Sequence, residues 1–190
     1  LVEKHMDLLG PVSGAAVLVG GILPEDAELL GIYSYPLQCC ESTALHGTEA
    51  IDLTGALCED GFLRMDVPEG QWRLFVLYTT HTEGGRAHYM NLIDRTSVRV
   101  LLDAVYEPHY MRYKDDFGKT FAGFFSDEAE LGNSMGYNFH ETLGRPDVAL
   151  PWSKELENEL RKKWGGNFAI YLPALWYEWG KETSNIRYTY

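Results

Sequence analysis

Apolar positions in the first half of the chain follow patterns that predict short β-strands. The run at 62–67 partly alternates apolar and polar residues, as a half-buried strand does. The run at 72–78 is apolar on both faces after Arg73, which is typical of a strand covered on both sides. We expect strands at 15–19, 50–57, 62–67 and 71–80, with turns at 59–61 and 68–70. Residues 1–9 mix apolar and charged positions at helical spacing, so we expect a short helix that Gly10-Pro11 stops.

The second half changes to a helical period. Asp94 is a good N-cap, and apolar residues recur at Val98, Leu101, Leu102 and Val105, so we expect an amphipathic helix over 95–117. Pro108 lacks a backbone N–H and should kink or interrupt this helix. A second helix is expected over 153–164, with i,i+4 pairs Glu157–Arg161 and Glu159–Lys163 and a stop at Gly165-Gly166. Apolar runs at 120–127 and 168–172 have strand length.

The resulting order, strand, helix, strand, helix, strand, predicts parallel strands joined by crossover helices. The fold class expected is therefore α/β, a partial (β/α)8 TIM-barrel-like segment with a β-rich insertion or side domain. We assign residues 1–70 to the β-rich region and 71–190 to the βα units. A complete barrel needs about 250 residues. We therefore expect the 190 residues to be a segment of a longer polypeptide, whose remaining part would be its partner.

The charge balance excludes several partners. With 16 Lys+Arg against 28 Asp+Glu, the formal net charge is −12, and no basic patch is visible for nucleic acid or an anionic membrane surface. The longest apolar runs are far shorter than the roughly 20 residues that span a bilayer. Aromatic residues are abundant, at 12 Tyr, 8 Phe and 5 Trp. Such side chains suit a core and also a cleft that stacks on sugars.

The sequence offers no cofactor or metal motif. Cys39, Cys40 and Cys58 cannot pair completely and lack zinc-site spacing, so we expect reduced, partly buried thiols, which favour a cytoplasmic location. The stretch 140–144 fails the His-Glu-x-x-His pattern at its last position. A Ca²⁺ ion on the acidic loops has no EF-hand spacing to support it. Phosphate-loop and serine-hydrolase motifs are also absent from the sequence.

The sharpest chemical feature is the pair Asp127-Glu128 at the end of the apolar run 120–126. Catalytic groups of α/β barrels lie at the carboxyl ends of strands. A carboxyl group beside Phe124 and Phe125 would be partly desolvated, which favours the neutral form of a general acid. Neighbouring strand residues point to opposite faces, so both acids can face a cleft only if the strand ends or bulges there. A solvated acidic loop is the other interpretation of the same residues.

Phe-Phe-Ser-Asp-Glu at 124–128 resembles the Phe-Phe-(Ser/Thr)-Asp-Glu-Pro signature of α-L-rhamnosidase-like glycoside hydrolases. Segments 67–74, 106–110 and 117–123 are also similar to that family, in the same order. The resemblance implies a multidomain hydrolase with a barrel, in which Glu128 is the proton donor. Asp127 would bind substrate or tune the pKa of Glu128. The family's Pro is Ala129 here, so the fixed turn geometry is lost.

Other residues are candidates for contacts with a carbohydrate substrate. His81 and Asn91 follow the strand 71–80 at the same end as Glu128, and Trp152 and Trp176 could stack on a sugar ring or pack in the core. Glu178, between aromatic residues, is the best second carboxyl group in the chain, and the alternative is a residue beyond Tyr190. The sequence thus predicts a glycoside hydrolase. A non-catalytic carbohydrate-binding homologue and a structural fragment are the alternatives.

Overall fold

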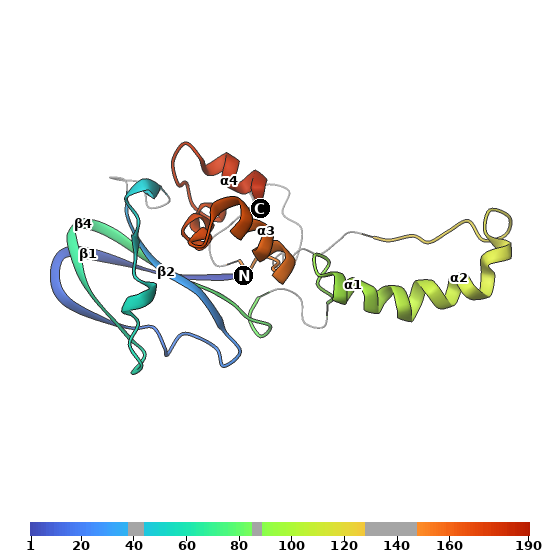
Figure 1. Ribbon diagram of the computed structural model, residues 1–190, viewed down its shortest axis with the longest axis horizontal. Helices are drawn as coiled ribbons and strands as arrows, with labels where there is room; N and C mark the ends of the chain where they lie inside the picture. The colour runs from blue at the N-terminus through green and yellow to red at the C-terminus, as the bar shows by residue number, and fades with distance from the viewer. Residues whose placement is uncertain (38–43, 85–88, 128–147) are drawn as a thin grey trace.

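The computed structural model describes residues 1–37, 44–84, 89–127 and 148–190 (Figure 1). Its centre is one sheet of four strands in the order β1-β4-β2-β3, and every neighbouring pair is antiparallel. The strands are β1 (Val2–Leu18), β2 (Glu28–Pro36), β3 (Ile51–Asp52) and β4 (Phe62–Thr79). The α-helices are α1 (Arg95–Leu101), α2 (Glu107–Tyr113), α3 (Lys154–Trp164) and α4 (Thr183–Thr189), and the longest 3-10 segment is η5 (Phe168–Leu175).

The expected barrel-like α/β fold is therefore wrong. The second half of β4 bonds to β1 on one side and to β2 on the other, so it has no free edge for a parallel partner. Residues 122–127, expected to continue the parallel sheet, form no regular element, and the run expected as a strand at 168–172 belongs to the 3-10 segment η5. The prediction of parallel strands joined by crossover helices is wrong because an apolar run in the sequence does not identify the strand with which it pairs.

Residues 1–9 form strand and not the expected helix. They belong to β1, whose residues Val2–Leu9 pair with the second half of β4. Local helical spacing is a weak preference, and pairing with a distant strand overrides it. β1 lies at the edge of the sheet, and residues 3, 5 and 7 share one of its faces.

β4 runs without a chain reversal through Pro68-Glu69-Gly70, where the sequence predicted a turn. The β1–β4 pair is irregular at this point, with register shifts between Gly10 and Val12 and again before Ala15. Register shifts of this kind mark β-bulges, which bend a strand. A Cβ atom on Gly10 would lie 1.8 Å from the Pro68 carbonyl oxygen, so only glycine fits the inside of this bend.

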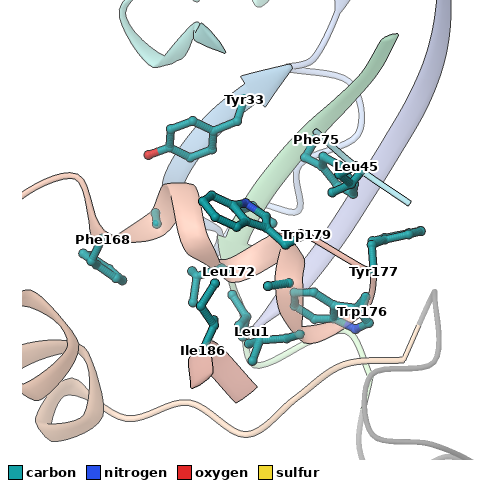
Figure 2. Packing of buried hydrophobic residues seen from close by; sticks show 14 of the residues in the cluster. Leu1, Tyr33, Leu45, Phe75, Phe168, Leu172, Trp176, Tyr177, Trp179 and Ile186 are labelled. Carbon is teal, nitrogen blue, oxygen red and sulfur yellow. The ribbon is translucent and has the colours of Figure 1, made fainter. Parts of the chain in front are cut away.

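The two faces of β4 are buried in two separate hydrophobic clusters. Phe75 and Leu77 pack with Tyr33 and Tyr35 of β2 against η5 and the segment after it. Figure 2 shows side chains of this cluster, with Tyr33 and Phe75 coming from the sheet and Phe168, Leu172 and Trp176 coming from η5 and the segment after it. Trp72, Leu74, Val76 and Tyr78 point the other way and pack with Leu63, Met65 and Val67 from the first half of the same strand. The prediction of a strand covered on both sides is confirmed.

A buried polar network fastens the edge strand β1 to the chain after η5. Glu3 is 2% exposed and accepts a hydrogen bond from the Tyr177 hydroxyl at 3.2 Å, while the His5 ring lies 3.1 Å from its other oxygen. Arg73, 5% exposed, donates two hydrogen bonds to Asp7 at 2.6 and 2.7 Å. The Arg73 guanidinium also lies 5.0 Å from the centre of the Tyr177 ring, in a cation–π contact.

Helix α3 agrees closely with its prediction. The Ser153 hydroxyl accepts a hydrogen bond from the Leu156 N–H at 3.1 Å, and Gly165 ends the helix with a φ of 83°. Arg161 donates to Glu157 at 2.9 Å, as expected from the i,i+4 spacing. Glu159 pairs with Lys162 at 2.6 Å and not with the expected Lys163.

Residues 95–127 form an arm that projects from the rest of the molecule (Figure 1). Asp94 caps α1 through its side chain, as predicted, and a π-helical turn over Leu102–Tyr106 leads directly into α2 before Pro108. The returning chain lies along the helix through aromatic contacts, such as Tyr106 with Phe124 at 4.5 Å between ring centres. None of the arm residues is buried, so the apolar side of the predicted amphipathic helix does not pack in a core.

Two phenylalanines give a direct test of this arrangement. Phe75→Ala removes a side chain that is 0% exposed, and we expect it to lower the free energy of unfolding by about 3–5 kcal/mol. Phe125 is 89% exposed, so Phe125→Ala should change that free energy by less than about 0.5 kcal/mol. Urea unfolding followed by tryptophan fluorescence measures both. If Phe125→Ala lowered the free energy of unfolding as much as Phe75→Ala, the exposed position of Phe125 would be contradicted.

Candidate functional site

A cleft of about 440 Å³ lies where the end of β4, the start of β2 and the start of α3 meet. Its walls come from the ends of these elements and from the loop that follows β4. Its lining residues include Asp26, Glu28, Thr80, His81, Glu83, Tyr89, Asn91, Asp94, Trp152, Lys154 and Glu157. Mixed aromatic, amide, hydroxyl and carboxylate groups of this kind can hold a small polar ligand and fix its orientation.

The Asp26 carboxylate organises the loop after β4. Its Oδ1 accepts hydrogen bonds from the hydroxyls of Thr80 at 2.7 Å and Thr82 at 2.8 Å. Its Oδ2 accepts the backbone N–H of His81 at 2.7 Å. These hydrogen bonds, with that of Thr80 the strongest, lower the pKa of Asp26 to about 2. Asp26 therefore carries a full negative charge at neutral pH.

A close contact between Gly84 and Ala149 holds the loop against the opposite wall. Gly84 has a φ of 73°, and a Cβ atom there would lie 2.1 Å from the Ala149 Cβ. Glycine is required for both reasons, because other residues avoid this backbone region and would clash. The next residue, Leu150, is fixed in turn by its N–H donating to the Leu1 carbonyl at 2.9 Å.

Asn91 and Trp152 form part of the wall beside α3. The Asn91 side-chain amide donates to the Trp152 carbonyl at 2.7 Å, and its oxygen accepts the Ile93 N–H at 3.3 Å. The Trp152 ring is half-buried and stacks near Phe168, with 6.1 Å between ring centres and 19° between planes. The Asn91 side chain thus positions the Trp152 backbone and lines the cleft at the same place.

Glu157 is the second described carboxylate of the cleft with a shifted pKa. Burial opposes its ionisation, but hydrogen bonds from Lys154 and Arg161 outweigh burial and lower its pKa. Both partners lie 2.9 Å from the carboxylate oxygens. A general acid must hold a proton at the working pH. Asp26 and Glu157 are both ionised there, so they suit hydrogen-bond acceptance and not proton donation.

The residues predicted from the sequence divide into two groups. His81, Asn91 and Trp152 come together in the cleft. Trp176 is 4% exposed, donates its ring N–H to the Val148 carbonyl at 2.9 Å, and packs in the core (Figure 2). Glu178 is largely exposed, pairs with Arg187 at 3.2 Å and is not among the lining residues.

Of the predicted acid pair, Asp127 is the last described residue of the arm. Asp127 is exposed and is not among the lining residues of the cleft. Glu128, the predicted general acid, lies outside the described residues, as do Ala129, Cys39 and Cys40. The third cysteine, Cys58, is free and partly buried.

Sequence reasoning missed Asp26 and Glu157 as cleft residues. Asp26 lies in a weakly patterned loop, 54 residues before Thr80. The signal that could have drawn attention to its partners is Thr80-His81-Thr82 directly after an apolar strand, because hydroxyl groups at a strand end seek an acceptor. Glu157 was read only as an i,i+4 partner of Arg161.

The described residues contain neither a candidate metal site nor a membrane-spanning helix. No group of three or more His, Cys, Asp or Glu in this part of the chain could hold a metal ion. No described helix has the length and apolar character needed to cross a bilayer.

Comparison with models of protein families, with curated proteins and with solved structures finds no match to the chain. The similarity to α-L-rhamnosidase-like hydrolases therefore stays a prediction from the motifs at 67–128.

Substituting Gly84 should disturb the cleft more than substituting a glycine with free space around it. Gly84→Ala introduces both the clash with Ala149 and an unfavourable φ, and we expect a loss of about 1–3 kcal/mol in the free energy of unfolding. Gly55 has no atom within 4 Å of a built Cβ, so Gly55→Ala is the matched control and should change it by less than about 1 kcal/mol. Chemical denaturation measures both, and equal effects would contradict the contact.

Asp26 should make stability depend on pH. Folding lowers the pKa of Asp26 from its ordinary value of 3.8 to about 2, so its contribution to stability is present above pH 3.8 and is lost as the pH falls through about 2. Asp26→Asn should therefore lower the melting temperature at neutral pH, and the difference from wild type should shrink between pH 4 and pH 2. Melting curves across this range measure it. A difference that is constant with pH would contradict the role of the charge.

Proposed function

We propose that this protein is a glycoside hydrolase in which the cleft binds the sugar and Glu128 donates the proton to the leaving oxygen. One observation carries the proposal. His81, Asn91 and Trp152, three sugar-contact candidates separated by up to 71 positions in the sequence, line one cleft.

The chemistry of the lining supports carbohydrate as the ligand. Sugars present many hydroxyl donors and an apolar ring face, so their sites combine polar acceptors with aromatic surface. The cleft supplies the Asp26 and Glu157 carboxylates as acceptors and Tyr89 and Trp152 as aromatic surface. The volume of about 440 Å³ lies in the range of small-molecule sites.

Hydrolysis needs a protonated acid in addition to these acceptors, because the leaving oxygen must gain a proton as the glycosidic bond breaks and water supplies the new hydroxyl group. The described cleft acids with shifted pKa values, Asp26 and Glu157, are both held ionised. The proton donor in the proposal is Glu128, the role that the family resemblance implies for it. It belongs to the motif at 124–128 that resembles the hydrolase signature.

A second candidate function is carbohydrate binding without hydrolysis. The same pKa shifts favour it, since neither Asp26 nor Glu157 can act as the acid. The replacement of the family's proline by Ala129 points in the same direction.

The variant Glu128→Gln tests the proposal. It keeps the size of the side chain and removes the proton, so hydrolysis of aryl glycosides with poor leaving groups should fall by about 10²–10⁴-fold. Activated substrates need less protonation and should be affected much less. Release of the aryl group from a panel of glycosides measures both rates, with the 190-residue chain as enzyme.

Glu59→Gln is the matched control, because Glu59 is an exposed acid in a turn and is not among the residues that line the cleft. Equal turnover of poor substrates by wild type and Glu128→Gln would refute the role of Glu128. Saturable glycan binding by calorimetry without any release over days would favour the binding function. Neither binding nor release would refute both candidates.

A further inference from the structure

We infer that the cleft binds glycans that carry amino groups more tightly than neutral glycans, and that it binds acidic glycans most weakly. Asp26 is the residue that determines this specificity. This inference rests on the proposed function, because it takes the cleft as the sugar site.

The charges on the cleft wall are unbalanced. Among the described lining residues, five are acids, namely Asp26, Glu28, Glu83, Asp94 and Glu157, and the bases are Lys154, His81 and the Leu1 amino group, whose pKa burial lowers to about 5. Lys154 bonds to Glu157 at 2.9 Å, and Glu83 has Lys4 at 3.5 Å. Asp26 and Glu28, in contrast, form no ion pair among the described salt bridges and are both exposed. A carboxylate or sulfate group entering the cleft would meet this excess of negative charge.

The geometry of Asp26 leaves a place for one ligand donor. A carboxylate oxygen can accept about two hydrogen bonds. The Thr80 and Thr82 hydroxyls take both places on Oδ1, whereas the hydrogen bond to Oδ2 from another described residue is that of the His81 N–H. These three partners are neutral, so they fix the carboxylate without cancelling its charge. A ligand ammonium group at the remaining place on Oδ2 would gain both a hydrogen bond and charge attraction.

Aromatic residues in the lining add to the same preference. Tyr89 is 40% exposed and Trp152 is half-buried, and both line the cleft beside the acids. The faces of aromatic rings attract cations as well as the apolar faces of sugars. An amino sugar therefore matches both the carboxylate and the aromatic parts of the lining.

The experiment compares three tetrasaccharides by calorimetry with the 190-residue chain. The probes are β-1,4-linked glucosamine, its fully N-acetylated counterpart, which has the same skeleton without charge, and galacturonate. At about pH 5.5 amines are protonated and carboxylates such as Asp26 are ionised. We expect the glucosamine tetramer to bind about fivefold or more tightly than the acetylated one, a difference that rising salt reduces, and galacturonate to bind weakest.

Two variants localise the effect. Asp26→Asn should abolish the preference for glucosamine over its acetylated form, and Glu28→Gln, which removes an exposed charge at the same cleft, should reduce it. Asp60→Asn is the matched control, since Asp60 is an exposed aspartate bonded to Arg64 and to the Phe62 N–H, and none of these residues lines the cleft. It should leave the preference unchanged.

The outcomes separate this inference from the proposed function. Equal or tighter binding of the acetylated tetramer, or a preference that Asp26→Asn leaves intact, would overturn the inference and keep the cleft as a sugar site. Hydrolysis or binding of neutral glycosides alone would do the same. Binding of no glycan at all would overturn the inference together with the proposed function.

Discussion

The strand β4 presents apolar side chains on both faces, and the free energy of keeping these side chains from water constrains the rest of the molecule. Its second half is flanked by β1 and β2, so its backbone groups are satisfied within the sheet. One face is then covered by η5, and the other packs with residues of the first half of the same strand, which is bent near Gly70. Because a hydrophobic cluster packs on each face of β4, the small sheet is the centre of the structure.

The cleft is a consequence of how the chain leaves β4. The loop from Thr80 must pass the end of the sheet, and the Asp26 carboxylate collects its hydroxyl and N–H donors. The opposite wall is held by Leu150, which bonds to the first residue of the chain. The polar groups of the cleft thus stabilise the loop and remain available to a ligand, because the charge of Asp26 is bonded but not neutralised.

The arm of residues 95–127 differs from the sheet, because local interactions and not packing in the core determine its structure. Its helices form from signals within a few residues, the Asp94 cap and the π-helical turn before Pro108. Its aromatic residues pack on one another and bury no side chain in the main core. Residues 124–127 of the hydrolase-like motif therefore lie on this locally formed arm, whereas His81, Asn91 and Trp152 lie on the segments that follow β4 and precede α3.

The sequence by itself determined the local elements: helix α3 with its stop at Gly165, the Asp94 cap of α1, and a central strand buried on both faces. It also indicated His81, Asn91 and Trp152 as cleft residues. Only the tertiary structure decided that all the strands pair in antiparallel fashion, that residues 1–9 are strand, and that Asp26 meets Thr80. Caps and helical stripes depend on neighbours within about four residues, whereas the choice of strand partner depends on which edges are left free across the whole chain.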